Sequence, residues 1–155
     1  MSIALLASWL ILGLNIGQAQ SDFGNDDLDD SWGLSASGTI TAEGLQFPLG
    51  TPLFAVGRMT FDGAGGCTAI DQLNIGGTIL PAPASFRTTA GDGSCTYMIN
   101  ADGTGFMSVT FGPSQPLPGT IDMTFVIVDD DAIRFITTNT PGFSVSGSLE
   151  EQDDD

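Results

Sequence analysis

The chain has 155 residues, of which 19 are acidic and three are basic, and it carries a formal net charge of -16 with no histidine. The shortage of basic residues argues against nucleic acids and anionic membrane surfaces as partners. The absence of histidine and lysine excludes Ser-His-Asp, Cys-His and Schiff-base catalysis. Hydrophobic residues make up 41% of the chain, enough for one domain with a packed core.

The first segment, residues 1–19, has the length and polarity of a signal peptide. Its apolar run at residues 3–14 is short for a membrane span, which needs about 20 residues. Gly17 and Ala19 supply the small residues expected before a cut after Ala19. We therefore expect a secreted or periplasmic protein. An uncleaved anchor is the alternative, because no positive charge precedes the run.

Ten of the 19 acidic residues lie in two segments that flank the centre of the chain. Five fall within residues 20–31 and five within residues 150–155. Such runs are typical of solvated segments that aid solubility. We therefore predict an acidic flexible linker at 20–31 and an acidic tail at 150–155, on either side of a domain at 32–149.

Within residues 32–149, apolar residues recur at every second position, which is the period of a strand with one buried face. Asp-Gly pairs between these runs are typical of hairpin turns. The pattern predicts an all-β domain, an antiparallel up-and-down meander of eight or nine strands. A closed barrel removes exposed edges most simply, and a β-sandwich is the alternative. The runs lie at residues 34–42, 53–61, 69–79, 84–89, 95–99, 107–111, 121–128, 133–135 and 143–149.

Three segments carry a resemblance to small exported bacterial proteins of unknown function. They are FAVGRMTFDGAGGC, YMINADGTGFMSVTF and TFVIVDDDAIRFITTNTPGFSVSGSLEEQ. The resemblance extends from about Trp32 to Gln152. It implies a calycin-like barrel, similar in architecture to the lipocalins and the allene oxide cyclases.

The glycine-rich stretch at residues 62–66 is predicted to be a hairpin corner. A phosphate-binding loop would need a helix after it, and a strand follows instead. Cys67 and Cys95 form either one disulfide or two separate thiols. In a simple meander their strands run the same way and lie about 9.6 Å apart, at about 4.8 Å per strand. A disulfide would then require the two neighbouring loops to lean together.

Asp71 breaks the alternation of its strand, because it shares the inward parity of Leu73. A buried carboxylate needs a partner or a raised pKa, and such groups are enriched at functional sites. The alternatives are a bulge that turns Asp71 outward and an aspartate near the barrel mouth whose carboxylate is satisfied by backbone amides. Tyr97 has inward parity on a nearby strand, so the two predict a polar ligand site or an acid/base pair. We expect the remaining lining to include Met59, Met107, Met123 and Phe125.

Arg58, Arg87 and Arg134 fall at outward positions, where we expect surface ion pairs. Metal sites and cofactors are not expected, since zinc in particular favours histidine and clustered cysteine. The leading hypothesis is a non-enzymatic binder of a small apolar molecule, or a cell-surface structural or interaction protein. The alternative is a cofactor-free cyclase or isomerase with Asp71 and Tyr97 in a shaped cavity. A hollow interior of a few hundred Å³ would favour either ligand hypothesis, and the oligomeric state stays open.

Overall fold

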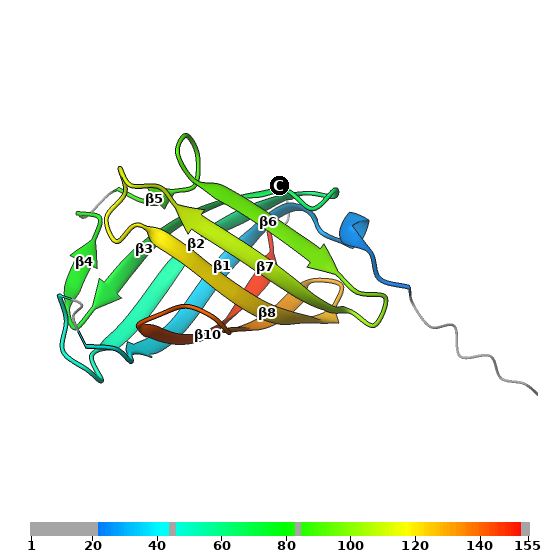
Figure 1. Cartoon of the computed structure of the whole chain (residues 1–155). Helices are drawn as coiled ribbons and strands as arrows, with labels where there is room; N and C mark the ends of the chain where they lie inside the picture. The colour runs from blue at the N-terminus through cyan, green and yellow to red at the C-terminus, as the bar shows by residue number, and fades with distance from the viewer. Residues whose placement is uncertain (1–21, 44–45, 83–84, 153–155) are drawn as a thin grey trace, which may run out of the picture.

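The computed structural model describes residues 22–43, 46–82 and 85–152, shown in colour in Figure 1. The predicted signal peptide at 1–19 lies outside the described residues, as do the last three residues of the predicted tail. Within the described ranges, no helix has the length and apolar character needed to cross a membrane.

The regular structure of the described chain consists of strands, preceded by the short 3-10 helix η1 (Asn25–Asp27). Every strand pair is antiparallel, so the predicted all-β antiparallel meander is confirmed. The strands are β1 (Asp29–Ile40), β2 (Pro52–Asp62), β3 (Cys67–Ile75), β4 (Thr78–Leu80), β5 (Arg87–Thr88), β6 (Ser94–Ile99), β7 (Thr104–Phe111), β8 (Gly119–Asp129), β9 (Ala132–Thr137) and β10 (Phe143–Glu151).

All these strands belong to one sheet rather than two, in the order β4-β3-β2-β1-β10-β9-β8-β7-β6, with β5 beside β3. The sheet curls strongly, with β6, β7 and β8 crossing in front of β1, β2 and β3 (Figure 1). Its two sides meet between β3 and β6, where the strands share one isolated antiparallel bridge, Gly66 to Thr96. The amide of Tyr97 also donates to the carbonyl of Gly65 at 2.9 Å. The fold is therefore barrel-like, with a seam between β3 and β6 that is bridged locally.

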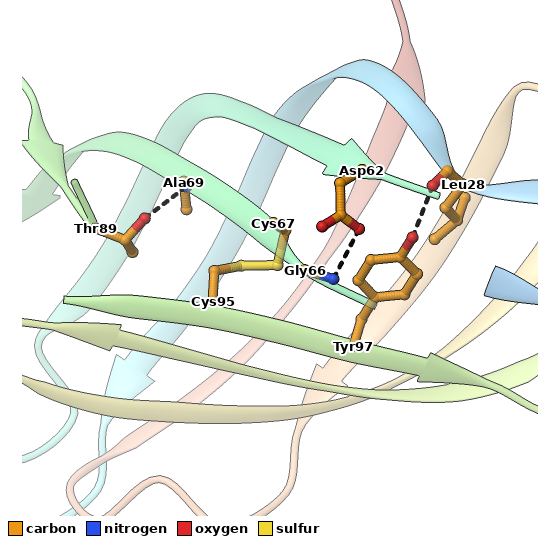
Figure 2. Close-up of a disulfide and its surroundings, with 8 residues drawn as sticks. All are labelled: Leu28, Asp62, Gly66, Cys67, Ala69, Thr89, Cys95 and Tyr97. Atoms are coloured by element: carbon orange, nitrogen blue, oxygen red, sulfur yellow. Dashed lines mark hydrogen bonds between the residues drawn. A yellow bond between two sulfur atoms is a disulfide. The ribbon is translucent and has the colours of Figure 1, made fainter. Parts of the chain in front are cut away.

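A disulfide joins Cys67 of β3 to Cys95 of β6 across this seam, with 4.9 Å between their Cα atoms (Figure 2). The predicted placement of the two strands is wrong, because β3 and β6 meet in antiparallel fashion. The prediction assumed that strands two positions apart along the chain are also two positions apart in the sheet and run the same way. The first and last long strands, β1 and β10, pair with each other, and the curl then brings β3 against β6.

The stretch at residues 62–66 is a hairpin corner, as predicted, and β3 begins directly after it. The Asp62 carboxylate accepts a hydrogen bond from the amide of Gly66 at 2.8 Å (Figure 2) and another from the amide of Ala64 at 2.8 Å. Gly63 and Gly65 have φ angles of 70° and 103°, which favour glycine. The amide hydrogen bonds lower the pKa of the Asp62 carboxyl group.

The acidic segment before the domain is packed against it, so the prediction of a flexible linker at 20–31 is wrong over residues 22–31. Leu28 is only 1% exposed, and β1 already begins at Asp29. The side chain of Asn25 accepts a hydrogen bond from the amide of Ile99. The buried side chain of Leu28 holds the segment against the domain although the residues around it are acidic. At the other end β10 reaches Glu151, so the domain also extends past 149.

The end of the sheet nearest η1 is filled by packed side chains. Trp32 and Phe61 meet edge-to-face with ring centroids 6.3 Å apart, and Phe61 meets Tyr97 in the same way at 5.0 Å. Leu28 and the buried side chains of β7, β8 and β9 complete this cluster. A separate, smaller cluster of buried side chains lies where β1 ends, around Ile40.

Candidate functional site

A cavity of about 620 Å³ lies inside the curled sheet, in the half away from η1. Its wall is mainly apolar and takes side chains from both sides of the seam. Residues 117–120, before and at the start of β8, and residues 139–141, between β9 and β10, also line it. The apolar wall includes Leu34, Leu53, Leu73, Phe111, Phe135 and Phe143.

One buried ion pair, Arg87 with Asp71, interrupts this apolar wall. The guanidinium donates through Nε to Oδ1 at 2.7 Å and through Nη2 to Oδ2 at 2.6 Å, a bidentate arrangement. Arg87 is 2% exposed and Asp71 is 5% exposed. The pair therefore lies almost entirely out of water, and each charge depends on the other for compensation.

Two further contacts fix the guanidinium of Arg87. Its Nη1 donates to the carbonyl of Leu117 at 3.2 Å, and its Cζ lies 3.9 Å from the centre of the Phe111 ring. The first contact ties the loop before β8 to the seam. The second is a cation–π arrangement, which favours a guanidinium in a place with little water. Arg87 therefore connects β5, β7 and the loop at residues 112–118.

The outward placement predicted for Arg87 is wrong, whereas Arg58 and Arg134 are exposed as expected. The prediction assumed one regular strand over residues 84–89. The strand is in fact the two-residue β5, which pairs with β3 so that Arg87 lies opposite Asp71. The parity of a longer strand therefore did not apply. An unexplained inward carboxylate in a chain with only three arginines was the available signal for this pairing.

Asp71 points inward, as its parity predicted. The register of β2 with β3 runs unbroken past it, with Gly57 directly opposite, so no bulge turns it outward. Gly57 itself is required by this close approach. A Cβ at Gly57 would collide with the carbonyl oxygen of Ile70 and would lie 2.9 Å from the Cα of Asp71. The glycine thus lets β2 and β3 come together where the ion pair sits.

Tyr97 lies away from the cavity, at the packed end of the sheet. Its hydroxyl lies 2.8 Å from the carbonyl oxygen of Leu28 (Figure 2). It also lies 2.9 Å from the carbonyl oxygen of Asn25, so its one proton is shared between the two acceptors. Burial raises the pKa of the Tyr97 hydroxyl, and the charge of Asp62 adds to the effect. Tyr97 therefore anchors η1, and the acid/base pair that the sequence suggested with Asp71 is not formed.

The other expected lining residues differ in whether they border the cavity. All four belong to the packed cluster, and Met59 and Met123 also line the cavity, whereas Met107 and Phe125 do not. Both pairs have the inward parity that the sequence indicated. Parity distinguishes inside from outside, but it cannot distinguish a filled layer of the interior from a hollow one.

Across the residues that the structure describes, no three histidine, cysteine or acidic side chains are grouped so that they could hold a metal ion. Asp122 also borders the cavity, but its carboxylate accepts a hydrogen bond from the hydroxyl of Ser108 at 2.8 Å, and both residues occupy outward positions of β8 and β7. The cavity is thus a largely apolar chamber with one internally compensated ion pair.

Comparison with known proteins supports the fold. No family model matches the chain, and no curated protein matches it in sequence. A redesigned β-barrel, b11L5F_LGL, is similar with a TM-score of 0.56 and 16% identity, covering 88% of this chain and 98% of that one. A second redesigned β-barrel, mFAP1 bound to DFHBI, is similar with a TM-score of 0.51 and 13% identity, covering 86% of this chain and all of that one. At these identities the likeness shows a barrel-like fold alone.

Proposed function

We propose that this protein binds a small, mainly apolar molecule inside its barrel. The observation that carries the proposal is the cavity of about 620 Å³, with its apolar wall. Sites for small ligands are typically concave, mostly apolar and about 300–1,000 Å³ in volume, with a few polar groups that orient the ligand. This cavity has that size and that composition.

Two further observations support the proposal. The redesigned barrel mFAP1, of similar fold, was solved bound to DFHBI, so a barrel of this kind can hold a ligand. The packed end of the sheet, around Trp32 and Phe61, supplies the core that a folded domain needs. The hollow half can therefore serve binding without being the main source of stability.

The experiment uses N-phenyl-1-naphthylamine, an uncharged dye that fluoresces in apolar surroundings, together with two tryptophan variants of neighbouring residues. Ala55 is buried at the cavity wall, whereas Val56 points outward and is 57% exposed. Ala55→Trp fills part of the cavity and is expected to weaken dye binding at least about tenfold, a change of about 1.4 kcal/mol. Val56→Trp is the matched control and is expected to bind the dye like the original protein.

Cooperative thermal unfolding shows whether each variant is folded. Equal binding by the two folded variants would place the dye outside the cavity and contradict the proposal. Native mass spectrometry of protein purified from its own host then searches for a retained molecule. That molecule should be present with the original sequence and lost with Ala55→Trp.

We propose further that the protein works outside the cytoplasm, after removal of residues 1–19. A disulfide between Cys67 and Cys95 supports this, because such bonds persist in oxidising compartments. The measurement is a thiol titration of protein recovered from the periplasm or the culture medium, denatured without reductant. Absence of titratable thiols is expected, together with an N-terminus at residue 20. Two free thiols, or an intact N-terminal segment, would contradict the proposal.

A further inference from the structure

The charge on the cavity wall restricts the chemistry of the ligand. Among the described residues, three charged ones border the cavity: Asp71, Arg87 and Asp122. The carboxylate of Asp122 bonds the Ser108 hydroxyl, and both residues occupy outward positions of their strands, so Asp71 and Arg87 are the two whose charges face the interior. Arg87 is engaged by Asp71 through two short hydrogen bonds, so it contributes no uncompensated positive charge. Asp71 is engaged in the same way by Arg87, so the wall offers no uncompensated charge of either sign to a ligand.

The geometry around Arg87 also keeps an anion from reaching it. One face of the guanidinium lies on Phe111, two nitrogens face Asp71, and the third donates to the carbonyl of Leu117. Only 2% of Arg87 is exposed. A carboxylate or sulfonate in the cavity would therefore lose its water without gaining an ionic partner, which is strongly unfavourable.

The charge of the whole molecule acts in the same direction. The chain carries a formal charge of -16, and its other two arginines, Arg58 and Arg134, lie on the outer face of the sheet. Anions are repelled during their approach to such a protein, and a low-dielectric cavity extends the effect to the bound state.

We propose that the ligand is uncharged, and that the cavity rejects anionic amphiphiles such as fatty acids and aryl sulfonates. This inference rests on the proposed function and narrows it to one chemical class. The ion pair is a fixed dipole in the wall, which suits a hydroxyl, ether or carbonyl group on an otherwise apolar ligand.

The test compares two dyes that share one aromatic skeleton and differ by a sulfonate. N-phenyl-1-naphthylamine is neutral, and 8-anilino-1-naphthalenesulfonate carries one negative charge. With the original protein, the neutral dye is expected to bind at least about tenfold more tightly, a difference of about 1.4 kcal/mol. Equal affinities, or tighter binding of the sulfonate, would overturn the inference and leave the cavity proposal intact. If neither dye binds, the proposed function itself fails.

Asp71→Asn tests whether the charge balance at the cavity wall, rather than the greater water solubility of the sulfonate, determines the preference between the two dyes. The variant leaves Arg87 with an uncompensated positive charge at the wall. The affinity for the sulfonate is expected to rise about tenfold, or about 1.4 kcal/mol, while that for the neutral dye changes much less. A parallel change in both affinities would overturn the inference.

A double variant keeps the inference testable if Asp71→Asn does not fold. Asp71→Leu with Arg87→Met removes both charges together and keeps the wall apolar. Because the pair is already compensated, the preference for the neutral dye is expected to remain at about tenfold or more. A further selective loss of sulfonate binding would show that Arg87 had been available to anions, and would overturn the inference.

Discussion

The Arg87–Asp71 pair predicts a strong asymmetry between removing one partner and removing both. Asp71→Leu deletes the carboxylate and leaves the guanidinium buried. The side chains are 3% and 7% exposed, so water cannot replace the lost partner without opening the seam. We expect the single variant to lose about 3–5 kcal/mol of unfolding free energy, the usual cost of an uncompensated buried charge.

Coulomb's law gives a similar magnitude for the attraction between the two charges. Two unit charges about 4 Å apart attract each other by about 4 kcal/mol at an effective dielectric constant of about 20. The pair also incurred a desolvation cost on folding, and that cost disappears when both charges are removed. Asp71→Leu with Arg87→Met is therefore expected to lie within about 1–2 kcal/mol of the original protein.

The assay is urea unfolding at neutral pH of the original protein, the two single variants and the double variant, followed by tryptophan fluorescence. A double-mutant cycle gives the coupling energy between the two residues. Arg58→Met, at an exposed position, is the matched control for the loss of an arginine and is expected to change stability by less than about 0.5 kcal/mol. A cost of less than about 1 kcal/mol for Asp71→Leu, or single effects that simply add, would show that the two buried charges do not depend on each other.

The remaining predictions concern the packed end of the sheet. Replacement of Cys67 and Cys95 by serine removes the disulfide, which joins residues 28 positions apart in the sequence. The unfolding free energy is expected to fall by about 3.5 kcal/mol, because the unfolded chain is no longer constrained. Urea unfolding measures the change, and a loss below about 1 kcal/mol would contradict the prediction. Tyr97→Phe removes the hydroxyl whose proton is shared by the carbonyls of Asn25 and Leu28, and is expected to cost about 1–3 kcal/mol, with faster hydrogen exchange at η1. Unchanged exchange would count against the anchoring role of Tyr97. The lowered pKa of Asp62 means that its contribution to stability is present above the unfolded pKa near 3.8 and is lost as the pH falls through the folded value. Asp62→Asn should therefore show less acid destabilisation than the original protein in thermal melts between pH 6 and pH 2, and identical pH profiles would argue against this.

Alternation of apolar and polar residues was sufficient to predict the strands and their inward faces. Buried residues occupy alternate positions of β6 and β7, as the pattern of Cys95, Tyr97 and Ile99 indicated. The corner at Asp62 was equally predictable, because an Asp-Gly pair supplies the glycine that such a turn requires. Features that depend on residues close together in the sequence, such as strands and tight turns, could therefore be predicted.

The features that could not be predicted depend on contacts between distant segments. Arg87 and Asp71 are brought together by a two-residue strand, too short to show any period. The disulfide depends on how far the sheet curls, which no single strand encodes. The burial of Leu28 was hidden by the acidic residues around it.

The antiparallel pairing of the first and last long strands places both acidic segments at one pole of the molecule. Trp32 lies opposite Glu151, and the amide of Gln152 donates to the carbonyl of Ser31 at 2.9 Å. The acids of residues 22–30 and the acids at 150 and 151 thus gather at the η1 end, while the cavity occupies the other half. A cationic surface would hold the molecule by this pole and leave the chamber facing the solution. Capture on an anion-exchange support should therefore yield an oriented layer that still takes up its ligand, without any chemical coupling.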